Sequence, residues 1–232
     1  METIVLLALA LLFGGGERNK EEAEYSPSNK EAVQEVYNPS ATRLSDIIHT
    51  DLSVRFDWEK QHLHGTAEIT AKPYFRATNE LILDAKGFDI HNIKMGEQTL
   101  VYTYKNDKLN IQLDKNYNRT ESYTVSIDYT AKPNELDTEG GVAITDAKGL
   151  YFINPLGEED KPQQIWTQGE TEFSSCWFPT IDKPNERMTQ NIAITVQNKY
   201  TTLSNGLLVK SEQNKDGTRT DYWEQSLGHT PY

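Results

Sequence analysis

Two carboxylates that could bind a ligand lie in the segment from Gln164 to Pro184, which reads QIWTQGETEFSSCWFPTIDKP. Glu170 and Glu172 are surrounded there by four aromatic residues and two prolines, which are Trp166, Phe173, Trp177, Phe178, Pro179 and Pro184. Gly169 permits close approach of another part of the backbone, and the prolines disfavour a central strand. The segment therefore predicts a loop that holds a ligand.

Residues that could bind a metal are sparse. Among the five histidines only His62 and His64 are close in sequence, and side chains at i and i+2 of a strand share a face. A metal site also needs a third ligand and a buried setting, whereas we expect His62 to Gly65 to form an exposed turn edge. The 232 residues contain no H-E-x-x-H motif. We therefore assign no metal ligand and no catalytic residue to this chain.

Other reactive or modifiable residues have simpler interpretations. Cys176 is the only cysteine, so the fold has no internal disulfide, and we expect a buried structural thiol rather than a nucleophile. Asp84, Asp89 and Asp182 follow or precede apolar runs, where roles in turns and caps are common. Asn118-Arg119-Thr120 matches the glycosylation sequon, which matters only in a eukaryotic secretory pathway.

Composition limits the partners and suggests an ordered part and a solvated part. The net charge of -12 disfavours nucleic acids and anionic lipid surfaces, because both would be repelled. A hydrophobic fraction of 36% and a mean hydropathy of -0.69 predict that some of the chain is solvated. We expect this part to be a flexible tether over residues 17–45, which is charged and polar.

The N-terminus predicts export. Ile4 to Phe13 is an unbroken apolar run followed by three glycines, which is typical of a signal peptide and indicates residues 1–16. The run is too short for a stable membrane span. Glu2 replaces the usual basic residues, so a mis-assigned start or a buried apolar strand remains the alternative. The expected location is secreted, or periplasmic at the cell envelope.

From residue 46 to residue 232 the pattern predicts an all-β domain. Short segments rich in Val, Ile, Thr and Tyr alternate in polarity and recur at similar spacing: Leu52 to Trp58, Thr66 to Lys72, Glu80 to Asp84, Ile90 to Met95, Leu100 to Lys105, Lys108 to Leu113, Tyr123 to Tyr129, Tyr151 to Asn154, Asn191 to Gln197 and Thr218 to Gln225. No amphipathic helical segment separates them, which favours antiparallel sheets in a sandwich or saddle.

Turn residues support this fold class. Asn106-Asp107 is expected to link two strands, and Gly140-Gly141 to open a loop. Asn205-Gly206 and Asp216-Gly217 predict hairpins, since these residue types tolerate positive φ.

The ligand-binding segment resembles a motif of the aminopeptidase N family of zinc metallopeptidases, Q-x-E followed by F-P-x-x-D-x-P. Six residues match it position by position: Gln168, Glu170, Phe178, Pro179, Asp182 and Pro184. Further segments are similar to landmarks of the same family's N-terminal domain: Asp84 to Asp89, Gly149 to Phe152, Tyr200 to Gly206 and His229 to Tyr232. The resemblance covers residues 46–232.

The resemblance implies a division of roles. Glu170 would bind the free α-amino group of a peptide substrate, Gln168 would line the same pocket, and Gly169, Phe178, Pro179, Asp182 and Pro184 would support the loop. Zinc, the H-E-x-x-H helix and the rest of the catalytic machinery would lie in a catalytic domain outside this chain. The implied partners are the N-terminus of a peptide substrate and that catalytic domain, and the chain alone would be inactive.

Two other functions stay open. β-Sandwiches often bind glycans or peptides through loop aromatics such as Trp166 and Trp177, so a stand-alone binding module is the alternative. A pure scaffold or docking role is the third possibility.

Overall fold

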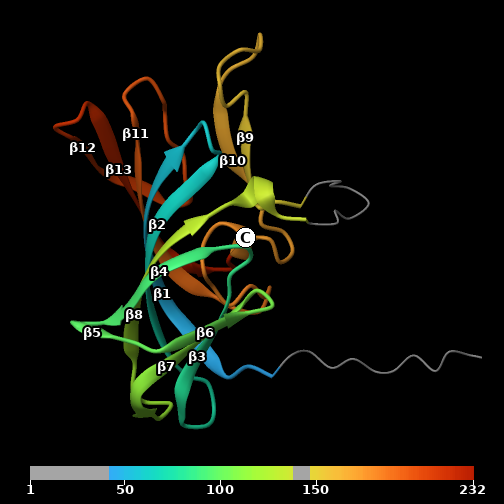
Figure 1. The fold of residues 1–232 in the computed structure, drawn as a ribbon. Helices are drawn as coiled ribbons and strands as arrows, with labels where there is room; N and C mark the ends of the chain where they lie inside the picture. The colour runs from blue at the N-terminus through green and yellow to red at the C-terminus, as the bar shows by residue number, and fades with distance from the viewer. Residues whose placement is uncertain (1–41, 138–146) are drawn as a thin grey trace, which may run out of the picture. The chain divides into compact units, whose positions relative to one another are not determined.

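The computed structural model describes residues 42–137 and 147–232 (Figure 1). The predicted signal peptide, most of the predicted tether and the Gly140-Gly141 loop lie outside the described residues. Within the described residues, no helix is long and apolar enough to cross a membrane. The all-β prediction is confirmed, since the only helices described are the short 3-10 turns η1 (Pro133–Glu135) and η2 (Ser174–Cys176).

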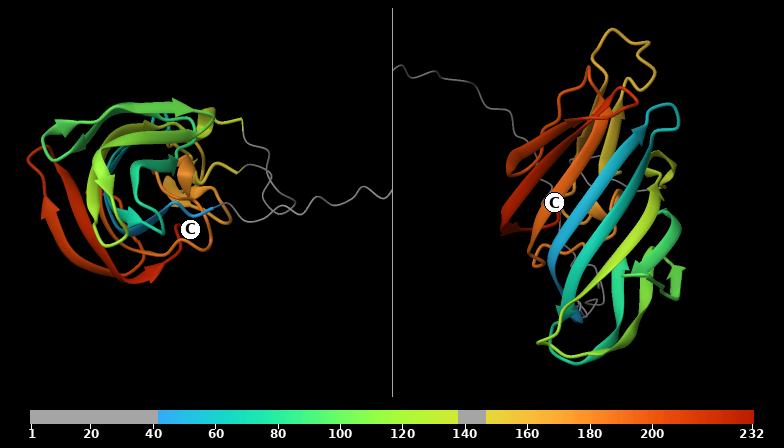
Figure 2. Two further views of the ribbon diagram at one scale, coloured as in Figure 1. Left: turned by 90° about the horizontal axis from the view of Figure 1, so that it is seen from below. Right: turned by 90° about the vertical axis from the view of Figure 1, so that its left-hand side faces the viewer.

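One large sheet carries most of the domain. Its eight strands lie in the order β12 (Leu207–Gln213), β13 (Thr218–His229), β11 (Met188–Gln197), β1 (Ser45–Asp57), β2 (His62–Pro73), β8 (Tyr123–Ala131), β4 (Asp89–Met95) and β5 (Gln98–Thr99). A three-stranded sheet has the order β3 (Thr78–Asp84), β7 (Lys108–Tyr117), β6 (Tyr102–Lys105), and β9 (Leu150–Ile153) pairs with β10 (Gln164–Thr167). Figure 2 shows the large sheet curving around the segment that joins β10 to β11.

The hydrophobic core lies against the inner face of the curved large sheet. Leu63, Ala67 and Ile69 of β2 are fully buried, as are Val125 and Ile127 of β8, and the residues between them are more exposed. This alternation follows from the two-residue side-chain period of a strand. The large sheet thus has one apolar face, packed on the smaller sheet and the β10–β11 segment, and one polar outer face.

One strand pair differs from the prediction of antiparallel sheets. β1 and β11 run parallel, with Leu52 opposite Ile192, whereas the other pairs described in the three sheets are antiparallel. Alternation of polarity reports which face of a strand is buried and contains no information on the direction of its neighbour. The sheet is therefore mixed.

The turn predictions had different outcomes. Asn106 and Asp107 join β6 to β7 with φ of 51° and 58°, and Asp216-Gly217 lies in the turn between β12 and β13, so both predictions are confirmed. The Asn205-Gly206 hairpin is wrong, because β12 pairs with β13 and not with β11. Gly206 has a φ of 84°, and a Cβ there would overlap the carbonyl oxygen of Glu224. Close approach to β13, rather than a hairpin turn, requires this glycine.

Candidate functional site

The segment between β10 and β11 forms the candidate site. We call residues 168–184 the site loop, Gln168–Glu170 its tip and Phe173–Asp182 its base. The side chain of Glu170 is exposed and that of Gln168 is half-buried. Neither makes a hydrogen bond or an ion pair with any residue that the structure describes. The tip therefore presents one carboxylate and one amide that are available to a ligand.

The start of β9 holds the tip in place. The backbone N–H of Gln168 donates to the carbonyl oxygen of Gly149 at 2.9 Å. Gly149 has a φ of +70°, and a Cβ there would overlap the carbonyl oxygen of Phe173. Only glycine accepts this φ and this contact without strain, so Gly149 ties the tip to the base.

Gly169 packs between the loop base and the end of the chain. A Cβ on Gly169 would overlap the hydroxyl of Ser174 and lie 3.0 Å from Cα of Tyr232. The Ser174 hydroxyl donates to the carbonyl oxygen of Pro231 at 3.0 Å, and Phe173 N–H donates to Gly169 at 2.9 Å. Residues 231–232 thus lie directly beside the tip.

The second carboxylate of the loop, Glu172, is already paired. Nζ of Lys183 lies 2.6 Å from its carboxylate, and Nζ of Lys86 donates to its backbone oxygen at 2.6 Å. Lys86 also lies 4.9 Å from the ring centroid of Phe173. Lysine charges therefore offset Glu172, whereas Glu170, two residues earlier, has no such partner in the described part of the chain.

Asp182 and the end of β3 hold the base. The buried carboxylate of Asp182 accepts the backbone N–H of Ser175 at 2.8 Å, and its own N–H donates to the Asp84 carboxylate at 3.1 Å. Asp84 and Thr180 exchange two backbone hydrogen bonds of 2.7 and 3.1 Å. Burial raises the pKa of Asp182, and the Ser175 N–H acts in the opposite direction.

The other predicted support residues differ in burial. Phe178 is fully buried and Pro179 is buried, whereas Pro184 is exposed at the end of the loop. Cys176 is free and fully buried, and burial raises the pKa of its thiol to about 12. The prediction of a buried structural cysteine is therefore confirmed, because so little thiolate forms at neutral pH.

The large sheet contributes one direct contact to the base. The Tyr129 hydroxyl of β8 donates to the carbonyl oxygen of Trp177 at 3.1 Å. Tyr129 is almost fully buried, and burial raises its pKa. Its ring occupies the space where Gly65 of β2 lacks a side chain. The hydroxyl therefore stays protonated and donates to the loop.

The two tryptophans of the segment have different surroundings. Trp166 is 47% exposed and stacks on Tyr151, with ring centroids 4.4 Å apart. Trp177 instead packs against the hydrophobic core. Of these two rings, Trp166 is the more exposed to solvent.

The histidine pair also differs from its prediction. His62 and His64 lie in β2 rather than at a turn edge, because that strand begins at His62. His62 Nε2 lies 2.7 Å from Glu135, and His64 Nδ1 lies 3.0 Å from the Thr130 hydroxyl. Across residues 42–137 and 147–232, no group of three or more His, Cys, Asp or Glu residues is arranged to hold a metal ion.

Sequence reasoning missed several residues that clamp the loop, namely Lys86, Tyr129, Gly149, Ser174 and Lys183. A pattern that could have found some of them was present. Lys86, Gly149 and Pro231 all lie in the segments that resemble family landmarks, and each contacts the site loop or its flanks. Three of the four landmarks thus contain residues that position the loop.

Comparisons with known proteins give a consistent result. The sequence model of the Peptidase M1 N-terminal domain matches residues 46–232. Leucine aminopeptidase 2 of Vanderwaltozyma polyspora is 22% identical over 184 residues, which are 78% of this chain and 26% of that protein. Transcription initiation factor TFIID subunit 2 of Danio rerio is 20% identical in an alignment of 197 residues, and the match covers 72% of this chain and 16% of that protein.

Solved structures share the fold. A two-domain M1 zinc metallopeptidase bound to L-tryptophan has a TM-score of 0.70 at 19% identity, and the M1 zinc metallopeptidase of Deinococcus radiodurans has 0.67 at 18%. Each match covers 82% of this chain and 41% of the other. Yeast LTA4 hydrolase has a TM-score of 0.63 at 16% identity, over 82% of this chain and 28% of its own. The chain therefore spans less than half the length of these proteins.

Proposed function

Because the chain belongs to the Peptidase M1 N-terminal domain family, we propose that its site loop binds the free α-amino group of a peptide. It would do so as part of a zinc aminopeptidase that removes N-terminal residues. Glu170 accepts the ammonium group in this proposal, and Gln168 contacts the first residue of the substrate. Gly169, Phe178, Pro179, Asp182 and Pro184 support the loop.

The observation that carries the proposal is the contrast between the two loop carboxylates. Glu170 stands unpaired at a tip that Gly149 and the Ser174–Pro231 contact hold in place. A charge-assisted hydrogen bond between an ammonium and a carboxylate contributes about 1.5–3 kcal/mol, and an internal peptide amide cannot replace it. A carboxylate so placed favours the end of a peptide over its middle.

Metal chemistry would come from elsewhere. No group of three or more His, Cys, Asp or Glu residues that could hold a metal ion is found in the described residues, and in this proposal the zinc is bound by the catalytic domain. In a longer chain, residues after Tyr232 would begin beside the tip, because Tyr232 packs on Gly169. A catalytic domain placed there could meet a substrate whose amino end Glu170 holds.

The solved neighbours support this assignment of substrate class. One is an M1 zinc metallopeptidase bound to L-arginine, and the Deinococcus radiodurans protein is described with a Tyr-Ser-Ala substrate. The same fold also occurs in yeast LTA4 hydrolase, and the sequence relatives include a transcription factor subunit. Fold alone therefore does not select the function, and the residues of the tip must.

We also propose that the protein is exported, to the cell envelope or beyond it. The support is the apolar run from Ile4 to Phe13 and the polar segment that follows it. Antibody detection of the native protein after cell fractionation tests this. Recovery only with the cytoplasmic fraction would contradict it.

The function is tested in the full-length protein with two matched variants of the site loop. Glu170→Gln should lower kcat/KM for aminoacyl-nitroanilides roughly tenfold to a hundredfold, since one charge-assisted contact is lost. Glu172→Gln removes an equal charge two residues away and should change kcat/KM far less. Equal effects of the two changes would contradict the assignment of Glu170. Absence of any aminopeptidase activity in the full-length protein would instead favour a scaffold or docking role.

A further inference from the structure

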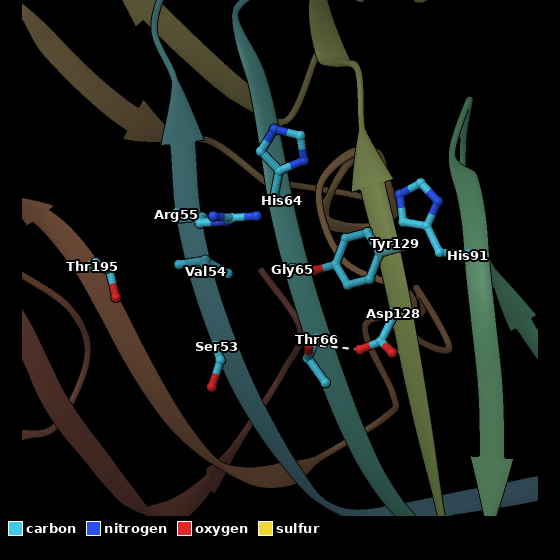
Figure 3. Close-up of a pocket in the computed structure, with 10 residues that line it drawn as sticks. All are labelled: Ser53, Val54, Arg55, His64, Gly65, Thr66, His91, Asp128, Tyr129 and Thr195. Carbon is cyan, nitrogen blue, oxygen red and sulfur yellow. Dashed lines mark hydrogen bonds between the residues drawn. The ribbon is translucent and has the colours of Figure 1, made fainter. Parts of the chain in front are cut away.

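A polar groove crosses the outer face of the large sheet, away from the hydrophobic core (Figure 3). It is open to solvent, has a volume of about 400 Å³, and extends over β11, β1, β2, β8 and β4. Arg55, His64 and Asp128 point to this side, whereas Leu63 and Ile127, their neighbours along the strands, are fully buried on the other. Nothing in the proposed aminopeptidase site uses the groove.

Two imidazoles meet at one hydroxyl in this region. His64 Nδ1 lies 3.0 Å and His91 Nε2 lies 2.8 Å from Oγ1 of Thr130. His91 reaches this position because a register shift in β4 between Ile90 and Asn92 leaves it unpaired with β8. Such an irregularity in a strand redirects a side chain. The two rings are therefore held side by side, and each retains a second nitrogen.

Arg55 is the one residue with a fixed positive charge among those that line the groove. It lies opposite His64 in the β1–β2 register, and its guanidinium makes no hydrogen bond or ion pair with any described residue. The nearby acids keep their negative charges and accept hydrogen bonds from neutral groups. Asp128 accepts from the Thr66 hydroxyl at 2.8 Å, and Asp57 accepts from the backbone N–H of Lys60 at 3.0 Å.

The pKa of His64 reflects its burial and the charges around it. Burial lowers the pKa of His64, and the Arg55 charge lowers it further. Of the other groups that face this ring, Asp57 acts in the opposite direction, while His62 and His91 act as Arg55 does. An anion bound beside His64 would offset the positive charge of Arg55, and it would therefore favour the protonated imidazole.

We propose that this groove binds an oxyanion, a carboxylate or a phosphate, between the guanidinium of Arg55 and the imidazoles of His64 and His91. A guanidinium presents its donors in a planar fork that matches both groups. The imidazoles supply further N–H donors when they are protonated. The small side chains of Ser53 and Thr195 leave room at the Arg55 end of the groove.

The test is a titration of the 232-residue chain at mildly acidic pH, in which NMR follows the histidine ring resonances. Inorganic phosphate and acetate are added separately, so that the two sources of the oxyanion are distinguished. We expect saturable shifts of the His64 and His91 signals with at least one of the two anions. The absence of a saturable shift with both would overturn the proposal.

Variants locate the site. Arg55→Gln should weaken binding about tenfold or more, since a charge-assisted contact is lost. It should leave the melting temperature unchanged, because Arg55 has no partner among the described residues. Arg76→Gln removes an exposed arginine from the segment between β2 and β3 and should bind as the parent does. Undiminished binding in Arg55→Gln would overturn the proposal.

Discussion

The tip and the base of the site loop follow one another in sequence and are built in opposite ways. The base is buried, with Ser174, Ser175, Cys176, Phe178 and Asp182 all at most 2% exposed, and it is bonded to β3 and β8. The tip carries Glu170, which is exposed and unpaired within the described residues. A residue that binds a ligand benefits from a free polar group on a rigid support, because its position is then fixed before the ligand binds.

The largest expected effect comes from disrupting the contact between Gly149 and Phe173 of the base. Gly149→Ala should lower the free energy of unfolding by about 3 kcal/mol, because it combines a positive φ with a backbone clash. Gly217→Ala is the matched control, with a φ of +83° and open space around the position. It should cost about 1 kcal/mol. Chemical denaturation of both variants measures the difference, and equal costs would contradict the role of the Gly149–Phe173 contact.

The second prediction concerns the buried carboxylate of the base. Because burial raises the pKa of Asp182 above its ordinary 3.8, the folded state keeps this proton to higher pH than the unfolded chain does. Its contribution to stability is present below pH 3.8 and is lost as the pH rises through the folded pKa. Asp182→Asn, which cannot ionise, should therefore gain in stability relative to the parent between acidic and neutral pH. Thermal melts across that range test this, and a constant difference would contradict it.

The smallest effect is expected at the Lys183–Glu172 ion pair, whose two residues directly flank the base in sequence. Both side chains are about one-third exposed or more, at 35% and 44%. Lys183→Gln should then change the free energy of unfolding by less than about 1 kcal/mol. It would leave a second unpaired carboxylate in the loop. If kcat/KM fell in this variant as far as in Glu170→Gln, the distinction between the two glutamates would fail.

The sequence predicted the positions of most strands more accurately than the pairing between them, and the first four residues of the predicted loop, Gln164–Thr167, form β10. Alternating polarity located β1, β2 and β8, because burial on one face imposes a period of two. It did not predict that β11 lies parallel to β1, since that depends on how distant segments pack. The hairpin predicted at Asn205-Gly206 was wrong for a similar reason, because close contact with β13, rather than a turn, requires this glycine.

Contacts between distant segments also limited what the sequence could predict about the site. Residue types identified the segment and its carboxylates Glu170 and Glu172, and the resemblance singled out Gln168 and Glu170 and supplied a role for them. Sequence could not show that Glu172 is paired with Lys183 or that Gly149 touches Phe173, since these contacts arise only when the chain is folded. The separation of the loop into a free tip and a bonded base is therefore a result of the structure.

The most direct test of the central claim measures whether Glu170 recognises the amino group itself. In the full-length protein, an amino-acid inhibitor of aminopeptidases and its desamino analogue are compared in the parent, in Glu170→Gln and in Glu172→Gln. The parent and Glu172→Gln should prefer the amino compound by roughly tenfold to a hundredfold, and this preference should largely disappear in Glu170→Gln. A preference that survives in Glu170→Gln would contradict the account.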